Sequence, residues 1–409
     1  MSSPSVTNSF SVGQLGTAAA MNQNFTDIVS GLSSGSTWDV VTSSLTSTDL
    51  SVSGAAEFTN LPEFFKDLNL ESNNACSGSF ISQVDSAPGS AAFYGGVLLP
   101  NGKVFCVPAS YTGTDYVFNP STGSFETQTD SAPGSLAFTG GVLLPNGKVF
   151  CMSYNYSGTD YVFNPATKQF ETQTDSVLGS ARFRGCVLMP NGKVFCVPFN
   201  YGGTDYVFNP ATGSFETQTD SAPGSLAFSG GVLLPNGKVF CVPSSYTGTD
   251  YVFNPSTGEF ETQTDSAPGT TAFIGGVLLP NGKVFCVPAN YTGTDYVFNP
   301  STGSFETQTD SAPGSGGFTG GVLMPNGKVF CVSYNYTGTD YVFNPSTGEF
   351  ETQTDSAPGG AAFFGGILMP NGNVFCVPFN YSSTNYVFNS CIYTKSAKPW
   401  CYHSMFNKF

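Results

Sequence analysis

Residues 220–264 read DSAPGSLAFSGGVLLPNGKVFCVPSSYTGTDYVFNPSTGEFETQT, and nearly the same 45 residues occur seven times in the chain. The copies follow one another without insertion or deletion, and each begins at an equivalent aspartate. These aspartates are Asp85, Asp130, Asp175, Asp220, Asp265, Asp310 and Asp355. A fixed period of about 20 to 50 residues is typical of repeat folds, in which each copy is one structural unit. The sequence therefore predicts seven equivalent units in one array.

Each copy divides into four short apolar segments separated by turn residues. In the first copy the strands are expected at residues 92–99, 103–107, 115–118 and 124–129. Asn101-Gly102 is a hairpin turn pair, and the proline-glycine segment 119–123 separates the third strand from the fourth. Four antiparallel strands in about 45 residues make one propeller blade. We predict an all-β fold, a seven-bladed β-propeller, because the helical periodicity of α-repeats is absent.

The two ends of the array complement each other. The seventh copy stops after its third strand, at Asn389, and lacks the fourth. Residues 78–84 lie directly before the first copy and match residues 123–129, at its end, in register. We therefore predict that residues 78–84 supply the outer strand of the last blade, so that the ring closes without an open sheet edge.

Two cysteines outside the periodic pattern fall where the ends meet. Cys76 and Cys391 both align with the turn position of Ser121. We predict a Cys76–Cys391 disulfide at this turn; two free thiols are equally compatible, and Cys401 is a rival partner for Cys391. Seven further cysteines share one position of the second strand: Cys106, Cys151, Cys196, Cys241, Cys286, Cys331 and Cys376. Because separate blades cannot bring these together as metal ligands, we expect small buried packing residues.

Charge and composition exclude several functions. The chain carries 13 Lys and Arg against 28 Asp and Glu, a net charge of −15, which argues against nucleic acid and anionic membranes as partners. No run of about 18 apolar residues occurs, so no membrane insertion is expected. The single histidine, His403, lies outside the repeats, and the carboxylates recur in every blade without one facing pair. We predict no catalytic residue, no metal and no cofactor, with the repeated aspartates capping turns rather than binding calcium.

The repeat also resembles a known family. Residues 95–105, GGVLLPNGKVF, and 116–125, YVFNPSTGSF, are similar to the kelch-type repeat of galactose-oxidase-like propellers. The resemblance covers residues 78–390 and implies the seven-bladed propeller. It departs after the second strand, where Val-Pro or Val-Ser replaces the glycine pair of kelch repeats. Copper oxidases of that group need His and Tyr ligands and a crosslinked Cys-Tyr pair. With His403 as the one histidine, the resemblance implies the fold and not the activity.

The copies differ mainly at the start of the first strand and the end of the second. Because these strands are antiparallel, both stretches are expected on the same face of the ring. The aromatic, amide and arginine residues there are Tyr94, Tyr154, Asn155, Arg184, Phe199, Asn200, Tyr334, Asn335, Phe364, Phe379 and Asn380. Aromatic rings that stack and amides that form hydrogen bonds suit sugars. We predict a ligand-binding face here; neutral variation of exposed loops is the alternative.

Residues 1–77 differ in composition from the repeats. The first 60 residues are rich in Ser, Thr, Ala and Asn and contain no basic residue, and the N-terminus has no secretory signal pattern. A short helix is expected around residues 21–32. Residues 43–54 are similar to shaft segments of trimeric viral and phage fibres, which implies an anchor and oligomerisation stem. A flexible Ser/Thr linker is the alternative.

Three domains are therefore expected: a partly helical, extended stem at 1–77, the propeller at 78–394 and a tail at 395–409. The functional hypothesis is a non-enzymatic viral structural protein, a fibre or spike on the virion surface. In it residues 1–77 would bind other virion proteins and form a homotrimer, and the propeller would bind a host receptor or glycan. The alternative is a cellular or secreted lectin or protein-interaction propeller, extracellular or cytoplasmic. An enzyme is the least favoured class.

Overall fold

The structure is a computed structural model of the 409-residue chain. It describes residues 78–86, 92–109, 114–131, 138–153, 160–175, 183–200, 204–221, 226–244, 249–266, 272–289, 294–311, 317–334, 340–353, 362–379 and 384–390. The disulfide expected between Cys76 and Cys391, its rival partner Cys401, the stem 1–77 and the tail 395–409 lie outside these residues. Every secondary-structure element in the described part of the chain is a β-strand.

The strands form seven sheets of four. The first sheet consists of β2 (Phe93–Leu98), β3 (Val104–Pro108), β4 (Thr114–Asn119) and β5 (Ser124–Ser131), and the second of β6 (Phe138–Leu143), β7 (Val149–Ser153), β8 (Tyr161–Asn164) and β9 (Gln169–Thr172). The third consists of β10 (Phe183–Leu188), β11 (Val194–Pro198), β12 (Thr204–Asn209) and β13 (Ser214–Ser221), and the fourth of β14 (Phe228–Leu233), β15 (Val239–Pro243), β16 (Thr249–Asn254) and β17 (Glu259–Ser266).

The fifth sheet consists of β18 (Phe273–Leu278), β19 (Val284–Pro288), β20 (Thr294–Asn299) and β21 (Ser304–Ser311), and the sixth of β22 (Phe318–Leu323), β23 (Val329–Ser333), β24 (Tyr341–Asn344) and β25 (Glu349–Thr352). The seventh consists of β26 (Phe363–Leu368), β27 (Val374–Pro378), β28 (Thr384–Asn389) and β1 (Ser79–Ser86). Each sheet is one blade.

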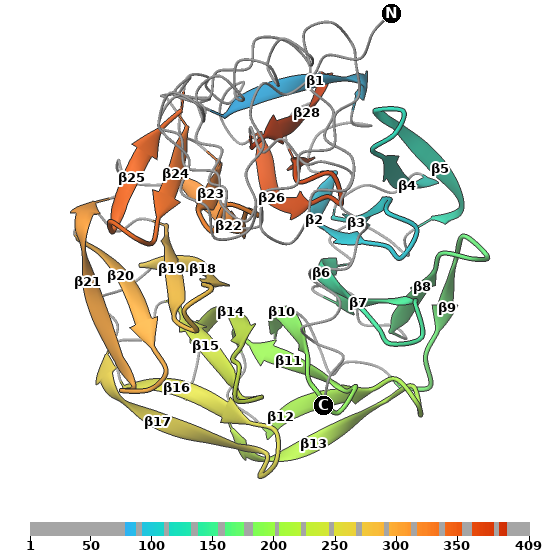
Figure 1. The fold of residues 1–409 in the computed structure, drawn as a ribbon. Helices are drawn as coiled ribbons and strands as arrows, with labels where there is room; N and C mark the ends of the chain where they lie inside the picture. Colours follow the sequence, from blue (N-terminus) through green and yellow to red (C-terminus); the bar gives the residue numbers. More distant parts are fainter. Residues whose placement is uncertain are drawn as a thin grey trace, which may run out of the picture. The chain divides into compact units, whose positions relative to one another are not determined.

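The seven blades are arranged in a ring, with the first strand of each repeat nearest the centre and the fourth at the outside (Figure 1). The first strands of neighbouring blades contact one another all the way around, including β2 against β26. All pairings within the blades are antiparallel. The all-β, seven-bladed propeller predicted from the repeat is confirmed.

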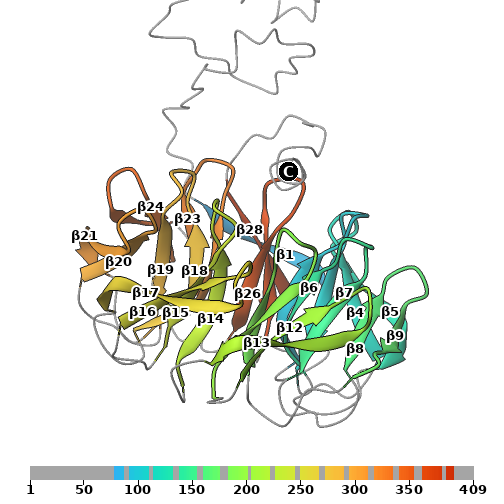
Figure 2. The same cartoon turned by 90° about the horizontal axis from the view of Figure 1, so that it is seen from below.

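A Pro-Asn-Gly turn forms the hairpin between the first two strands of each blade. In the first blade Gly102 has φ +80°, a left-handed conformation that glycine adopts without the steric cost of a Cβ. Its amide donates to the Leu99 carbonyl (2.9 Å), and Asn101 Oδ1 accepts from the Lys103 amide (3.1 Å). These hairpin turns project on one side of the ring (Figure 2). The starts of the first strands and the ends of the second strands therefore lie on the opposite side, which we call the variable face.

Strand β1 closes the ring from the N-terminal side. It pairs with β28, with Phe80 opposite Phe388, and the two rings have centroids 5.6 Å apart (Figure 1). The Phe80 ring also packs on Phe363 of β26, with a centroid distance of 5.9 Å. Asp85 Oδ2 accepts a hydrogen bond from the amide of Phe125 in the first blade (3.3 Å). The N-terminal strand β1 thus forms the outer strand of the last blade, as predicted from the match between residues 78–84 and 123–129.

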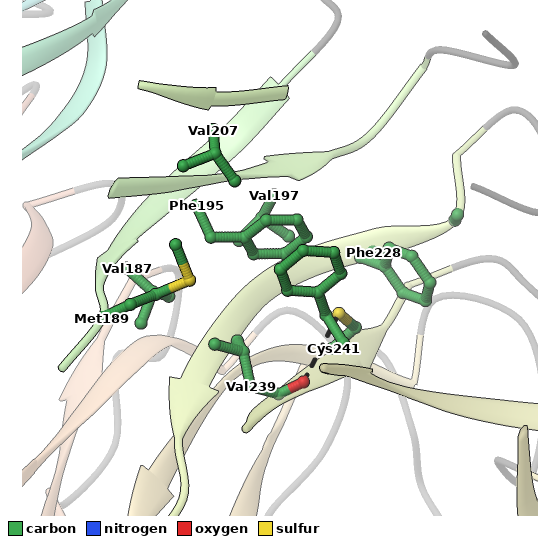
Figure 3. Close-up of a cluster of buried hydrophobic side chains, with 10 residues drawn as sticks. Val187, Met189, Phe195, Val197, Val207, Phe228, Val239 and Cys241 are labelled. Atoms are coloured by element: carbon green, nitrogen blue, oxygen red, sulfur yellow. Dashed lines mark hydrogen bonds between the residues drawn. The ribbon is translucent and has the colours of Figure 1, made fainter. Parts of the chain in front are cut away.

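The hydrophobic core lies between neighbouring blades. Figure 3 shows one cluster, in which Phe195 of the third blade packs among residues of the fourth, including Phe228 and Cys241. Phe195 and Phe253 stack with centroids 4.0 Å apart and planes inclined by 8°. The same stack occurs at all seven junctions, at 3.9 to 4.2 Å: Phe105–Phe163, Phe150–Phe208, Phe195–Phe253, Phe240–Phe298, Phe285–Phe343, Phe330–Phe388 and Phe375–Phe118. Aromatic stacking thus joins each blade to the next.

The periodic cysteines are buried packing residues, as the sequence predicts. All seven are fully buried free thiols. Cys241 donates to the Val239 carbonyl with Sγ and O 3.8 Å apart (Figure 3). Burial raises the pKa of this thiol well above its ordinary value. Because the thiolate is the reactive form, these positions are chemically inert in the folded protein.

Candidate ligand-binding face

Seven of the eleven residues predicted to line a ligand-binding face belong to the described part of the chain. Tyr94, Arg184 and Phe364 lie at the starts of β2, β10 and β26. Phe199, Tyr334 and Phe379 directly follow β11, β23 and β27, and Asn200 comes after Phe199. The remaining four, Tyr154, Asn155, Asn335 and Asn380, lie outside the described residues.

The structure brings four of these residues together across the closure of the ring. Phe379 is at the centre of this aromatic cluster, with Tyr94 at 5.4 Å, Phe364 at 5.1 Å and Tyr334 at 6.4 Å between ring centroids. Tyr94 also meets the edge of Phe364 at 4.8 Å. Phe379 is only 9% exposed, whereas the other three rings are half-buried. The cluster therefore presents three partly accessible rings on the variable face, contributed by the sixth, seventh and first blades.

Side-chain size explains why the rings gather at this part of the face. The position of Phe379 holds Ala109, Ser244 or Ala289 in the first, fourth and fifth blades, and all three are buried. The position of Tyr94 and Phe364 holds smaller residues in four other blades, Thr139, Ser229, Ile274 and Thr319. Large rings at both positions in neighbouring blades must meet, because the first strand of one blade lies beside the second strand of the previous one.

Arg184 and Phe199 form a separate pair in the third blade. The guanidinium carbon of Arg184 lies 4.9 Å from the centroid of the Phe199 ring, which is a cation–π contact. Both side chains are half-buried, and Asn200 is exposed beside them. The described part of the variable face thus carries two aromatic groups, one uncharged and one with a cation.

Six aspartates that the sequence placed near turns are buried instead. Each is the second residue of the third strand or directly precedes that strand, and all are at most 1% exposed: Asp115, Asp160, Asp205, Asp250, Asp295 and Asp340. Asp160 accepts a hydrogen bond from the Ser153 hydroxyl (2.6 Å). For these six acids, turn capping stays a prediction. The alternation of side chains along the strand could have predicted this burial, because Asp115 lies two residues before the buried Val117 and shares its face of the sheet.

The aspartates that open each repeat act between blades. Asp130 Oδ1 accepts from the Ser131 amide (2.9 Å), and Oδ2 accepts from the amide of Phe170 in the next blade (3.2 Å). Asp85 repeats both bonds, with Ser86 and with Phe125. Oδ1 thus caps the following residue of its own strand, and Oδ2 ties that outer strand to the outer strand of the next blade.

The opposite side of the ring carries paired charges. Lys103 lies 2.7 Å from Glu126, and the hydrogen bond from this lysine lowers the pKa of the glutamate below its ordinary value. The next five blades repeat the pair, and the described part of the seventh has Asn373 and Ile81 at the two positions. In the seventh blade both charged partners are replaced, so neither is left as an unpaired charge. Because these pairs are still partly open to solvent, each contributes modestly to stability.

One hollow lined by described residues is too small for an ordinary small-molecule ligand. A cavity of about 60 Å³ beside Gly78, Lys328 and Glu351 is far smaller than the about 300 Å³ of an ordinary small-molecule pocket. No group of three or more His, Cys, Asp or Glu side chains in the described part is placed to hold a metal ion. Nor does any helix there have the length and apolar character needed to cross a membrane.

Comparison with known proteins identifies relatives of the fold alone. No family model and no curated protein matches the sequence. The extracellular domain of a protein assigned as a hybrid two-component system of B. thetaiotaomicron superposes with a TM-score of 0.56 at 11% identity over 75% of this chain, which spans 40% of that chain's length. A fungal alcohol oxidase of the AA5 family, solved in complex with copper, superposes with a TM-score of 0.55 at 14% identity over 76% of both chains.

A third neighbour is the corresponding domain of another B. thetaiotaomicron system, with a TM-score of 0.54, 12% identity and coverage of 73% of this chain and 40% of that one. Copper does not fit the residues that the structure describes. The described part has no suitable group of ligands, and the single histidine of the sequence, His403, lies outside it. The neighbours therefore support the propeller fold and provide no evidence that this chain is an enzyme.

Proposed function

We propose that the propeller is the head of a non-enzymatic binding protein and that it recognises a host surface receptor or glycan through its variable face. The observation that carries the proposal is the aromatic cluster of Tyr94, Tyr334, Phe364 and Phe379. It unites residues from three blades at positions where most other blades have small side chains. Accessible aromatic rings stack on the apolar faces of sugars, and a propeller face offers room for several such contacts.

The proposal includes the rest of the chain as a stem. Residues 1–77 would anchor the protein to other virion proteins and join three chains, so that the propeller is displayed on the virion surface. The support is the similarity of residues 43–54 to fibre shafts. The alternative is a secreted or cellular lectin or protein-interaction propeller. An extracellular location for it is in keeping with the B. thetaiotaomicron neighbours, which are extracellular domains.

A glycan-binding assay tests the head. The full chain is expected to bind members of an immobilised panel of neutral and acidic oligosaccharides, and the double variant Tyr94→Ala/Phe364→Ala to bind at least about tenfold more weakly, the effect of losing one binding hot spot. Thr139→Ala, at the equivalent position of the second blade, is the matched control and is expected to bind as the wild type does. Absence of binding to every glycan, or equal binding by the double variant, would contradict the proposal.

The mass in solution tests the stem. The full chain is expected to run at about three times its chain mass of 42.9 kDa, and residues 78–409 alone as a monomer. Light scattering coupled to size-exclusion chromatography measures both. A monomeric full chain would contradict the hypothesis of a trimeric fibre. It would favour the alternative, a lectin or protein-interaction propeller.

A further inference from the structure

Two pairs of consecutive blades in the ring resemble each other: the second and third blades match the sixth and seventh. Residues 151–160, CMSYNYSGTD, correspond to residues 331–340, CVSYNYTGTD, four blades later. In both, a serine replaces the proline that ends the second strand elsewhere, and its hydroxyl donates to a buried aspartate, Ser153 to Asp160 and Ser333 to Asp340. In both blades the third and fourth strands have only four residues each. The second and sixth blades are thus structural counterparts.

The blades that follow them are counterparts too. Phe199 and Phe379 occupy equivalent positions after β11 and β27. The Phe199 carbonyl accepts from the Ala227 amide of the next blade (3.0 Å), and the Phe379 carbonyl accepts from the Ala92 amide of the next blade (3.2 Å). The backbone therefore presents the two phenylalanines in the same way on the variable face.

The first difference between the two groups is charge. Phe364 lies beside Phe379 with ring centroids 5.1 Å apart, and Arg184 takes the place of Phe364 beside Phe199, with its guanidinium carbon 4.9 Å from the ring centroid. A planar cation thus replaces a planar apolar ring at nearly the same separation. The guanidinium can stack on the ring and still direct N–H groups outward.

The second difference is access. Tyr94 stacks on Phe379 at 5.4 Å and helps to bury it. The residue equivalent to Tyr94 in the other group is Ser229, which is small and buried and donates to the Val242 carbonyl (3.4 Å). Phe199 is accordingly half-buried, whereas Phe379 is 9% exposed. The Phe199 ring is the more open of the two.

The charges of the described residues single out Arg184. It is the one arginine among them and lies on the variable face, whereas the six lysines that lie 2.6 to 2.7 Å from glutamates are on the opposite side of the ring. The whole chain has a net charge of −15, so an anion is repelled by most of the surface. On the described part of the variable face, Arg184 is the cation that an anionic ligand would meet.

We propose that Arg184 and Phe199 form a subsite for an acidic sugar, with the sugar ring against Phe199 and its carboxylate or sulfate on the guanidinium. The subsite rests on the proposed function, and it names the ligand class as acidic oligosaccharides. Arginine suits both anions because its fork donates two parallel hydrogen bonds. The aromatic cluster, which has no cation, takes a neutral part of the same or another glycan. The exposed Asn200 supplies an amide beside the subsite.

The test compares matched acidic and neutral probes on the full chain. Sialyllactose is paired with lactose, and a sulfated galactose disaccharide with its unsulfated form, so that the two pairs distinguish carboxylate from sulfate. The wild type is expected to bind at least one acidic probe about tenfold or more tightly than its neutral partner, since a charge-assisted hydrogen bond is worth about that factor. Added salt is expected to weaken the binding of the acidic probe more than the binding of its neutral partner.

The decisive variant is Arg184→Phe. It places at position 184 the same residue type as Phe364, the equivalent residue of the seventh blade. Its ratio of acidic to neutral affinity is expected to fall to about one, and Arg184→Lys, which keeps the charge but loses the fork, is expected to give an intermediate ratio. Thr139→Ala is the control and keeps the wild-type ratio. An unchanged ratio in a folded Arg184→Phe protein overturns the subsite. Wild-type binding of neutral glycans without any acidic preference overturns it while the proposed function stands, and binding of no glycan at all overturns both.

Discussion

Deletion of β1, Ser79–Ser86, from the full chain is expected to abolish cooperative folding of the ring or to lower its unfolding midpoint drastically. The deletion removes the pairing of β1 with β28 and uncovers Phe388, a fully buried ring of the last blade junction. It also removes Phe80, a half-buried ring packed on Phe363 and Phe388, whose loss adds a part of the about 3–5 kcal/mol that truncating a fully buried aromatic residue costs. The total rivals the about 5–15 kcal/mol by which ordinary domains are stable. Urea unfolding followed by fluorescence measures the effect.

Reconnection of the strand provides the control for this deletion. A chain in which residues 79–86 follow β28 through a Pro-Ser-Thr-Gly turn, as in the first, fourth, fifth and sixth blades, keeps the pairing of β1 with β28 and changes only its connection. Recovery of the wild-type midpoint in this chain would assign the loss to the missing strand. A deleted chain that unfolds at the wild-type midpoint would show that β1 does not hold the ring closed.

Phe195→Ala is expected to destabilise the propeller by about 3–5 kcal/mol, the usual cost of truncating a buried phenylalanine. Phe195 is fully buried and stacks on Phe253 of the next blade at 4.0 Å, so its removal leaves a cavity at the junction of the third and fourth blades (Figure 3). Neighbours such as Val207 and Val239 belong to rigid strands and cannot fully fill the space. The shift of the urea midpoint, with the slope of the wild type, measures the loss.

Two further variants separate packing from mere substitution. Phe195→Leu retains part of the apolar contact and is expected to cost less than Phe195→Ala. Val84→Thr places at an 86% exposed position the residue found at the equivalent position of the first blade, Thr129, and is expected to stay within about 0.5 kcal/mol of the wild type. Equal stability of Phe195→Ala and the wild type would mean that the stacks between blades do not hold the ring.

The match between residues 78–84 and 123–129 was sufficient to predict which strand closes the ring, because equivalent blades must use equivalent strands. It was not sufficient to predict how Asp85 acts there. Its link to the amide of Phe125 crosses from one blade to the next, and no pattern within a single repeat indicates contacts between repeats. The burial of Asp115, in contrast, follows from a pattern within one repeat, because this residue alternates in step with the buried Val117. A strand position shows which face a side chain occupies, but the neighbouring sheet decides whether that face is covered.

The sequence by itself determined the number of blades, their four strands, the hairpin turns and the origin of the closing strand. These features follow from local patterns that the chain repeats every 45 residues. Only the tertiary structure decided which variable residues meet. Tyr94 and Phe364 are 270 positions apart in the sequence and come into contact because the first and last blades are neighbours in a closed ring. It also decided that Phe199 stays more open than Phe379, since that difference depends on the size of a residue supplied by the following blade.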